Sequence, residues 1–342
     1  MKVFWDEAQL RHAPKFFLQR GVVRQNFEVP ARALALLEGC ATLGLKTVVP
    51  APAPAAMAAV HDPAYLQFLR DGPAAWAAQP GAGAEMVPNI HPSPEMLAQG
   101  AQRGTGVVGQ LGWFTADTSC PVSAETWPAA AAAAAGAAAA ADEALAGRTA
   151  YALARPPGHH AYAARAGGHC YINNAAIAAQ RLRDGGAARV AVLDVDSHHG
   201  NGSQGIFWDR GDVLFVSVHG DPSGYYPWYV GHAGERGTGA GEGCNLNLPL
   251  AQGTGDDGWL AAVGTGLDTI RRFRADALVV SLGFDALVDE PLTFLRVTAD
   301  GFARAAEGVA GLRLPAAIVQ EGGYNTDVIG GLLARFLGAC AG

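Results

Sequence analysis

Several features that mark other classes of protein are scarce in this chain. Its 342 residues carry a formal net charge of −7 without a dense basic run, which argues against binding nucleic acid or an acidic membrane surface. No uninterrupted apolar run approaches the ~20 residues that a membrane-spanning helix needs, and the N-terminal residues lack the apolar segment of a signal peptide. The five cysteines are widely spaced and include no Cys-x-x-Cys pair, which favours a reduced, cytoplasmic protein over a disulfide framework.

What the chain does contain is an alternation of short β-prone runs and helical stretches. Half of its residues are hydrophobic, enough for a large core. The alternation predicts an α/β fold with a mostly parallel sheet and helices on both faces. The predicted strands are Val3–Trp5, Thr47–Val49, Tyr151–Ala154, Val190–Val195, Val213–Val218, Ala277–Leu282 and Ala316–Val319, and the predicted helices lie near 129–146, 172–184, 256–273, 299–311 and 326–338.

One segment does not fit this alternation. Residues 71–121 are rich in proline and glycine and show no sustained period. A loop of this length inside a compact domain is usually functional or serves assembly. We therefore expect the segment to shape a binding site or an interface.

The strand predicted at Val190–Val195 ends in carboxylates and imidazoles. Asp194 and Asp196 are two residues apart, a spacing that puts both carboxylates on one side of an extended strand, and His198 keeps the spacing. Ligands of open α/β sheets bind beyond the carboxyl ends of such strands. A single Asp here would be read as a helix cap, but two carboxylates and an imidazole together predict a divalent metal site.

Three further polar groups follow other predicted strands. His159 and His160 come after Tyr151–Ala154, Asp285 after Ala277–Leu282, and Tyr324 after Ala316–Val319. Each alone has an ordinary structural explanation. Together they suit metal-assisted amide hydrolysis, in which a histidine moves protons and a tyrosine hydroxyl stabilises the oxyanion.

These motifs resemble those of the histone deacetylase superfamily, most closely the bacterial acetylpolyamine amidohydrolases and class II deacetylase-like amidohydrolases. The matching segments are RPPGHH at 155–160, GGHCYINN at 167–174, DVDSHHGNG at 194–202, SLGFD at 281–285 and EGGY at 321–324. The likeness runs nearly end to end. It implies the arginase–deacetylase fold, a single eight-stranded parallel sheet between helical layers, and a single deacetylase domain spanning 1–342.

The resemblance also implies site residues. Zinc, or ferrous iron in the cell, would be held by Asp196, His198 and Asp285. Tyr324 would polarise the carbonyl. The tandem histidines would be His159, oriented by Asp194, and His160, the general base and acid, whose partner would be Asn201. A structural potassium ion would be bound by Asp194, the backbone carbonyls of Asp196 and His198, Ser217 and Val218.

The substrate channel departs from the family pattern in places. Gly168 and Tyr226 would line it, and His169 stands where a Phe or Tyr is usual. Leu292, near the gatekeeper position, is apolar as in lysine deacetylases, and Val108 occupies the place of an acid expected in polyamine enzymes. The resemblance further implies a small acylated amine as substrate and a homodimer formed through the insertion at 71–121, which would narrow the site entrance.

Of three alternative functions, the first two are disfavoured by the residues present, and the third stays open. A two-manganese ureohydrolase needs a carboxylate two residues after Asp285, where Leu287 stands. A noncatalytic acyl-ligand binder would be expected to lack a ligand or the tyrosine. Hydrolysis of another small neutral or aromatic amide remains an alternative, since His169 and Val108 alter the channel.

Overall fold

The central element of the molecule is one parallel sheet. The computed structural model describes residues 1–341 and orders the strands β4-β1-β5-β10-β9-β6-β7-β8, with every pairing parallel. This confirms the predicted single eight-stranded parallel sheet. The strands are β1 (Lys2–Phe4), β4 (Thr47–Val48), β5 (Ala150–Ala152), β6 (Val190–Asp194), β7 (Val213–Gly220), β8 (Asn245–Leu250), β9 (Ala277–Leu282) and β10 (Ala316–Gln320).

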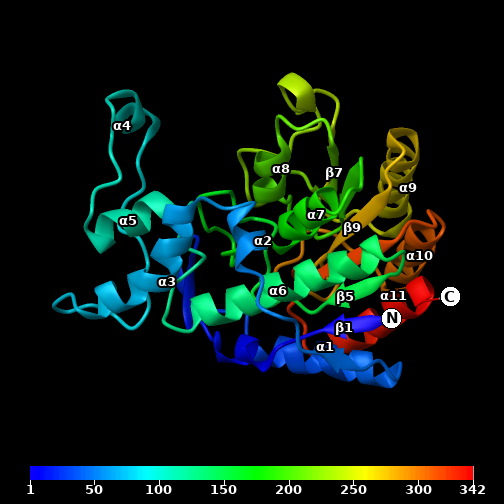
Figure 1. Cartoon of the computed structure of the whole chain (residues 1–342), viewed down its shortest axis with the longest axis horizontal. Coiled ribbons are helices and arrows are strands. Elements are labelled where there is room, and N and C mark those ends of the chain that lie inside the picture. Colours follow the sequence, from blue (N-terminus) through cyan, green and yellow to red (C-terminus); the bar gives the residue numbers. More distant parts are fainter. Residues whose placement is uncertain (342) are drawn as a thin grey trace.

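Helices cover both faces of the sheet, and each face has its own apolar core. Figure 1 shows α6 and α7 lying across one side of it. On that side are α2 (Pro54–Ala58), α6 (Thr126–Leu145), α7 (Asn174–Asp184) and α8 (Asn201–Phe207); on the other are α1 (Pro30–Thr42), α9 (Asp256–Phe273), α10 (Ala299–Ala310) and α11 (Ile329–Ala341).

Local sequence explains why these helices start and pack where they do. The α6 helix is almost all alanine on its buried face, which lets its backbone approach the sheet closely. The side chain of Asn173 caps α7 by accepting a hydrogen bond from the backbone N–H of Ala176. Asp256 and Asp257 open α9, and Arg271 and Arg272 close it, which suits the helix dipole.

The predicted strands and helices are all present, but other elements were not predicted, including the regular helices α1 and α3 (Pro63–Ala77) and the short helices α2 and α8. All seven predicted strands are present within two residues of their bounds. The edge strand β8 was not predicted because its sequence NLNLPL mixes asparagine and proline, which are depleted in strands. A short antiparallel hairpin, β2 (Phe16–Gln19) with β3 (Val22–Gln25), and a 3-10 helix η1 (Glu7–Arg11) were also unpredicted.

The segment 71–121 is not a structureless loop, so that part of the prediction was wrong. It includes the end of α3 (Pro63–Ala77) and two short helices, α4 (Pro94–Ala98) and α5 (Val107–Phe114). These helices are too short for periodicity to reveal them. Figure 1 shows α3, α4 and α5 as an arm extending away from the sheet. The base of the arm packs on a third apolar cluster that includes Leu111 and Phe114.

The length and apolar character of the helices bear on whether any of them could cross a membrane. None of those formed by residues 1–341 combines the length and apolar character needed to cross a bilayer.

Candidate active site

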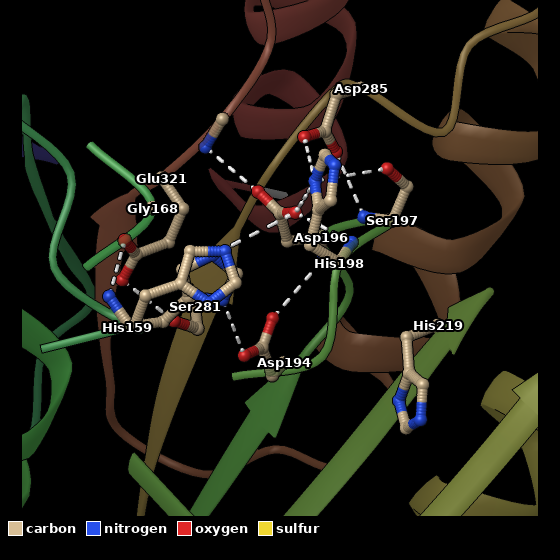
Figure 2. A network of polar contacts seen from close by, with 12 residues as sticks. His159, Gly168, Asp194, Asp196, Ser197, His198, His219, Ser281, Asp285 and Glu321 are labelled. Atoms are coloured by element: carbon tan, nitrogen blue, oxygen red, sulfur yellow. Dashed lines mark hydrogen bonds and ion pairs between the residues drawn. The ribbon is translucent and has the colours of Figure 1, made fainter. Parts of the chain in front are cut away.

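The polar groups predicted from the sequence meet at one edge of the sheet. Strands β5, β10, β9 and β6 are neighbours in that order, so the loops after their carboxyl ends lie side by side. These four loops carry the tandem histidines, the tyrosine, and the aspartates and histidine of the predicted metal site. The sheet order therefore brings together groups that lie up to 165 positions apart in the chain, as Figure 2 shows for most of them.

The three predicted metal ligands form one compact cluster. One ligand atom each of Asp196, His198 and Asp285 lies within 4.8 Å of the others. The Nδ1 atom of His198 is 2.9 Å from Oδ2 of Asp285 and 3.2 Å from Oδ1 of Asp196. Both carboxylates are fully buried. Two buried carboxylates beside an imidazole concentrate negative charge that a divalent cation would neutralise, and this donor set fits one.

Asp194 and Asp196 differ in placement from the extended-strand expectation. Strand β6 ends at Asp194, and Asp196 lies in the loop that follows. The Oδ1 atom of Asp194 accepts a hydrogen bond of 3.1 Å from the backbone N–H of Asp196, which turns the chain. The two carboxylates consequently serve different partners: Asp196 faces His198, and Asp194 faces His159.

The pair His159 and Asp194 is fully buried beneath the cluster. Nδ1 of the imidazole lies 2.9 Å from Oδ2 of Asp194, and Nε2 lies 3.8 Å from Oδ1 of Asp196. Burial alone lowers the pKa of His159, but the carboxylates of Asp194 and Asp196 outweigh it and raise that pKa well above its ordinary value. The two carboxylates therefore favour the protonated form of His159.

The second histidine of the tandem has a neutral partner. Nδ1 of His160 lies 2.6 Å from Oδ1 of Asn201, whose amide nitrogen donates to the Tyr162 hydroxyl. Because the amide oxygen accepts, Nδ1 carries the hydrogen and Nε2 keeps its lone pair. Burial, together with the neighbouring His159 and His198, lowers the pKa of His160 well below its ordinary value.

Tyr324 is held by contacts to its backbone and its ring. Its backbone N–H donates to Glu290 at 2.8 Å. The buried guanidinium of Arg32 lies over the ring, 4.8 Å from its centroid, and donates to the carbonyls of Gly323 at 2.5 Å and Glu321 at 2.6 Å. Burial raises the pKa of the Tyr324 phenol well above its ordinary value, so its hydroxyl stays a hydrogen-bond donor.

The residues expected around potassium are also adjacent. Ser217 on β7 is the register partner of Asp194 on β6, and Val218 follows it. The Ser217 hydroxyl lies 2.8 Å from Nδ1 of His219, a contact that the sequence did not suggest. The structure thus places Asp194 and Ser217 side by side at the end of the sheet.

A cavity of about 570 Å³ opens over this cluster. Its wall includes all four residues expected in the channel, and His160, His198 and Tyr324 face the same space; the four are Gly168, His169, Tyr226 and Leu292. Burial lowers the pKa of His169 to about 4, so this imidazole is a neutral wall group. Val108, on α5, is 42% exposed and lies outside the lining.

Three further residues shape the site through contacts that the sequence did not predict. The buried carboxylate of Glu321 accepts hydrogen bonds from the backbone N–H groups of Gly158 and His159 and from the Ser281 hydroxyl. The ring of Tyr225 stacks on His198 with centroids 4.5 Å apart. The carboxylate of Asp117 accepts hydrogen bonds from the Tyr226 hydroxyl and the Gly168 backbone N–H, two groups in the cavity wall. Their signals in the sequence are weak, because each acts on a residue distant along the chain.

A second group of metal-capable side chains lies nearby but suits an ion poorly. His159, Cys170 and Glu321 are buried with ligand atoms within 4.8 Å of one another. However, the Glu321 carboxylate already accepts three hydrogen bonds, and Nδ1 of His159 is paired with Asp194. These groups support the tandem-histidine loop instead.

Comparison with known proteins agrees with this geometry. The histone deacetylase domain matches residues 26–340. The chain is 45% identical over 342 residues to an acetylpolyamine amidohydrolase of Burkholderia pseudomallei, covering 99% of this chain and 98% of the relative. It is 42% identical over 334 residues to acetylpolyamine amidohydrolase 1 of Pseudomonas aeruginosa, covering 96% and 95%. The crystal structure of the B. pseudomallei acetylpolyamine aminohydrolase matches with a TM-score of 0.95 at 44% identity, covering 100% of this chain and 98% of that chain. The chain therefore belongs to the histone deacetylase family, a family of metal-dependent hydrolases.

Proposed function

We propose that this protein hydrolyses the amide of a small acylated amine, releasing acetate or a short acid. The observation that carries the proposal is the convergence of the ligand cluster, His160 and Tyr324 on one cavity. The identity of 40–45% to acetylpolyamine amidohydrolases over nearly the whole chain supports acetylated polyamines as substrates.

A divalent ion would be held by Asp196, His198 and Asp285. When bound, such an ion lowers the pKa of water and polarises a carbonyl oxygen. The protein would supply the rest of the chemistry. We propose zinc as the ion, with ferrous iron as the alternative that the same oxygen-rich ligands accept.

Proton transfer falls to the tandem histidines. The lone pair on Nε2 of His160 takes the proton of the attacking water, and the same nitrogen returns a proton to the departing amine. Asn201 fixes the tautomer that makes this possible, since its amide oxygen holds the hydrogen on Nδ1. His159 is held in a fixed orientation by Asp194, whose Oδ2 atom lies 2.9 Å from its Nδ1.

Tyr324 completes the site as the oxyanion donor. Its hydroxyl remains protonated and faces the cavity. A donor of this kind stabilises the transition state by roughly 3–4 kcal/mol. Arg32 and Glu290 keep the Tyr324 loop in place from either side.

The test of the proposed function is acetate release from N-acetylputrescine by zinc-loaded protein. We expect turnover that is lost on treatment with a chelator and restored by zinc. Turnover that survives removal of all metal would contradict the metal-dependent mechanism. Absence of turnover on every acylated amine, with metal bound, would favour the noncatalytic binder.

Potassium and assembly are further proposals. We propose that Asp194, Ser217, Val218 and the backbone carbonyls of Asp196 and His198 bind potassium. Replacing potassium by a large organic cation should then lower the thermal midpoint.

We also propose a homodimer formed through the 71–121 arm, which exposes Ile90 (61%), Met96 (42%) and Leu97 (45%). Sedimentation at several concentrations tests it, and a monomer throughout would contradict it.

The proposed cellular location is the cytoplasm. The five cysteines are all free, as expected for a protein kept in a reducing compartment. Fractionation of cells that express the chain tests this, and recovery outside the cytoplasm would contradict it.

A further inference from the structure

The carboxylate of Asp117 is committed to contacts within the protein. Its Oδ2 atom accepts a hydrogen bond of 2.6 Å from the Tyr226 hydroxyl and one of 3.0 Å from the Gly168 backbone N–H. Its Oδ1 atom accepts one of 2.7 Å from the Ser119 backbone N–H, and the Cys120 thiol lies 3.9 Å away. Both oxygens therefore have donors without any ligand.

These bonds join three chain segments that wall the cavity. Asp117 comes from the segment after α5, Gly168 from the turn before α7, and Tyr226 from the loop after β7. The Tyr226 ring stands edge-on to His160, with centroids 4.8 Å apart. The segments are tightly fitted, because a Cβ added at Gly168 would lie 2.9 Å from the Tyr226 hydroxyl and 2.4 Å from the His160 ring. A shift of Tyr226 would therefore alter the channel beside the proposed base.

Asp117 is also the acidic residue that lines this cavity. Apart from histidines, the charged side chains that line it are Asp117 and Arg20. Val108, at the position where an acid was expected, lies outside the lining. Arg20 is exposed at the tip of the β2–β3 hairpin and is a cation. Among the described residues of this chain, the cavity lining therefore includes no carboxylate that is free of protein hydrogen bonds and could meet a second ammonium on the substrate.

We propose that Asp117 is a positioning residue, which holds the Tyr226 side chain and the Gly168 backbone in the cavity wall through two hydrogen bonds, here called the clasp. The site therefore accepts linear acylated amines without requiring a second ammonium group. The inference rests on the proposed amide hydrolysis and narrows its substrate class. Burial raises the pKa of the Tyr226 phenol, and the charge of Asp117 raises it further, so the hydroxyl stays the donor in this clasp.

The test compares two substrates that differ in one charge. N-acetylputrescine ends in an ammonium, and N-pentylacetamide replaces that ammonium by a methyl group. The readout is the ratio of kcat/KM for the charged substrate to kcat/KM for the neutral one. This ratio is insensitive to a general loss of active protein.

We expect Asp117→Asn to leave that ratio within about twofold of the starting protein, since the carboxylate does not meet the ammonium. We expect Tyr226→Phe to raise it about two- to fivefold, because one lone pair of Asp117 becomes free for an exposed ion pair. Tyr229→Phe, at an 87% exposed tyrosine of the same loop, is the matched control and should not change the ratio. A tenfold or larger fall in Asp117→Asn, or an unchanged ratio in Tyr226→Phe, would overturn the proposal.

The clasp can be tested separately from activity. In a double-mutant cycle of thermal midpoints, Asp117→Ala and Tyr226→Phe should be non-additive, because each removes the hydrogen bond between the Tyr226 hydroxyl and residue 117. Additive midpoints would overturn the clasp even if both substrates are hydrolysed. Failure to hydrolyse either substrate, with non-additive midpoints, would contradict the proposed function and leave the clasp intact.

Discussion

The floor and the mouth of the cavity are built in contrasting ways. The floor consists of loops that follow four neighbouring parallel strands, and its acids and imidazoles are mostly buried and held by polar partners within the protein. The mouth comes from the β2–β3 hairpin, the segment after α5 and the loop after β7, and it includes exposed groups such as Trp228 (51%) and Leu18 (40%).

This difference separates chemistry from selectivity. Groups at the floor are fixed by the register of the sheet, since moving one of them would require moving a buried strand. Groups at the mouth lie on loops that can change without disturbing the core. Substitutions at the floor should therefore abolish the reaction, and those at the mouth should alter which substrates are used.

The largest effect is expected from Asp285→Asn. Loss of a ligand carboxylate should reduce deacetylation by more than the ~10–100-fold that loss of an outer hydrogen-bonding partner costs. Steady-state acetate release measures it, with circular dichroism as the control for folding. Activity within threefold of the starting protein would show that this residue does not hold the ion.

The second-largest loss of activity is expected from Tyr324→Phe. Removing the oxyanion donor is expected to lower kcat by about 10²–10³-fold with little change in KM or metal content. Full kinetic curves and elemental analysis check both parts. A rise in KM with kcat unchanged would instead assign Tyr324 to substrate binding.

Asn201→Asp should shift the pH profile. A carboxylate beside His160 favours the charged imidazole, so its pKa rises and the neutral base form is lost at a higher pH. The acidic limb of kcat/KM should therefore move upward by about 1 pH unit or more. A limb that stays in place or moves downward would contradict the assignment of His160 as the base.

Glu321→Gln should cost stability at the floor. The carboxylate satisfies three buried donors, and a single amide oxygen cannot accept all three hydrogen bonds. We expect the free energy of unfolding to fall by about 1–3 kcal/mol. Urea denaturation measures the change, and an unchanged midpoint would show that the donors find other partners.

The smallest effect is expected beside the mouth, at a residue that does not line the cavity. Val23, 65% exposed on β3, does not line the cavity, so Val23→Ser should change stability by no more than about 0.5 kcal/mol. Deacetylation should be similarly unaffected. A large loss of activity would show that the hairpin contributes to catalysis, as the residues at the floor do.

The same contrast explains what the sequence could predict. Strand runs and their polar ends are local signals, so the sheet and the residues gathered at its edge were accessible without coordinates. The hairpin and the short helices α4 and α5 carry no such periodicity. The contacts of Asp117 and Tyr225 also lay beyond the sequence, because they join loops whose relative placement depends on packing.

Metal binding is the most direct test of the account. Zinc titrated into metal-free protein, followed by calorimetry, should reveal one tight site that Asp285→Asn removes or greatly weakens. The account predicts that result because Asp196, His198 and Asp285 together form the ligand cluster. Equal zinc affinity in the two proteins would place the ion elsewhere and contradict the proposed active site.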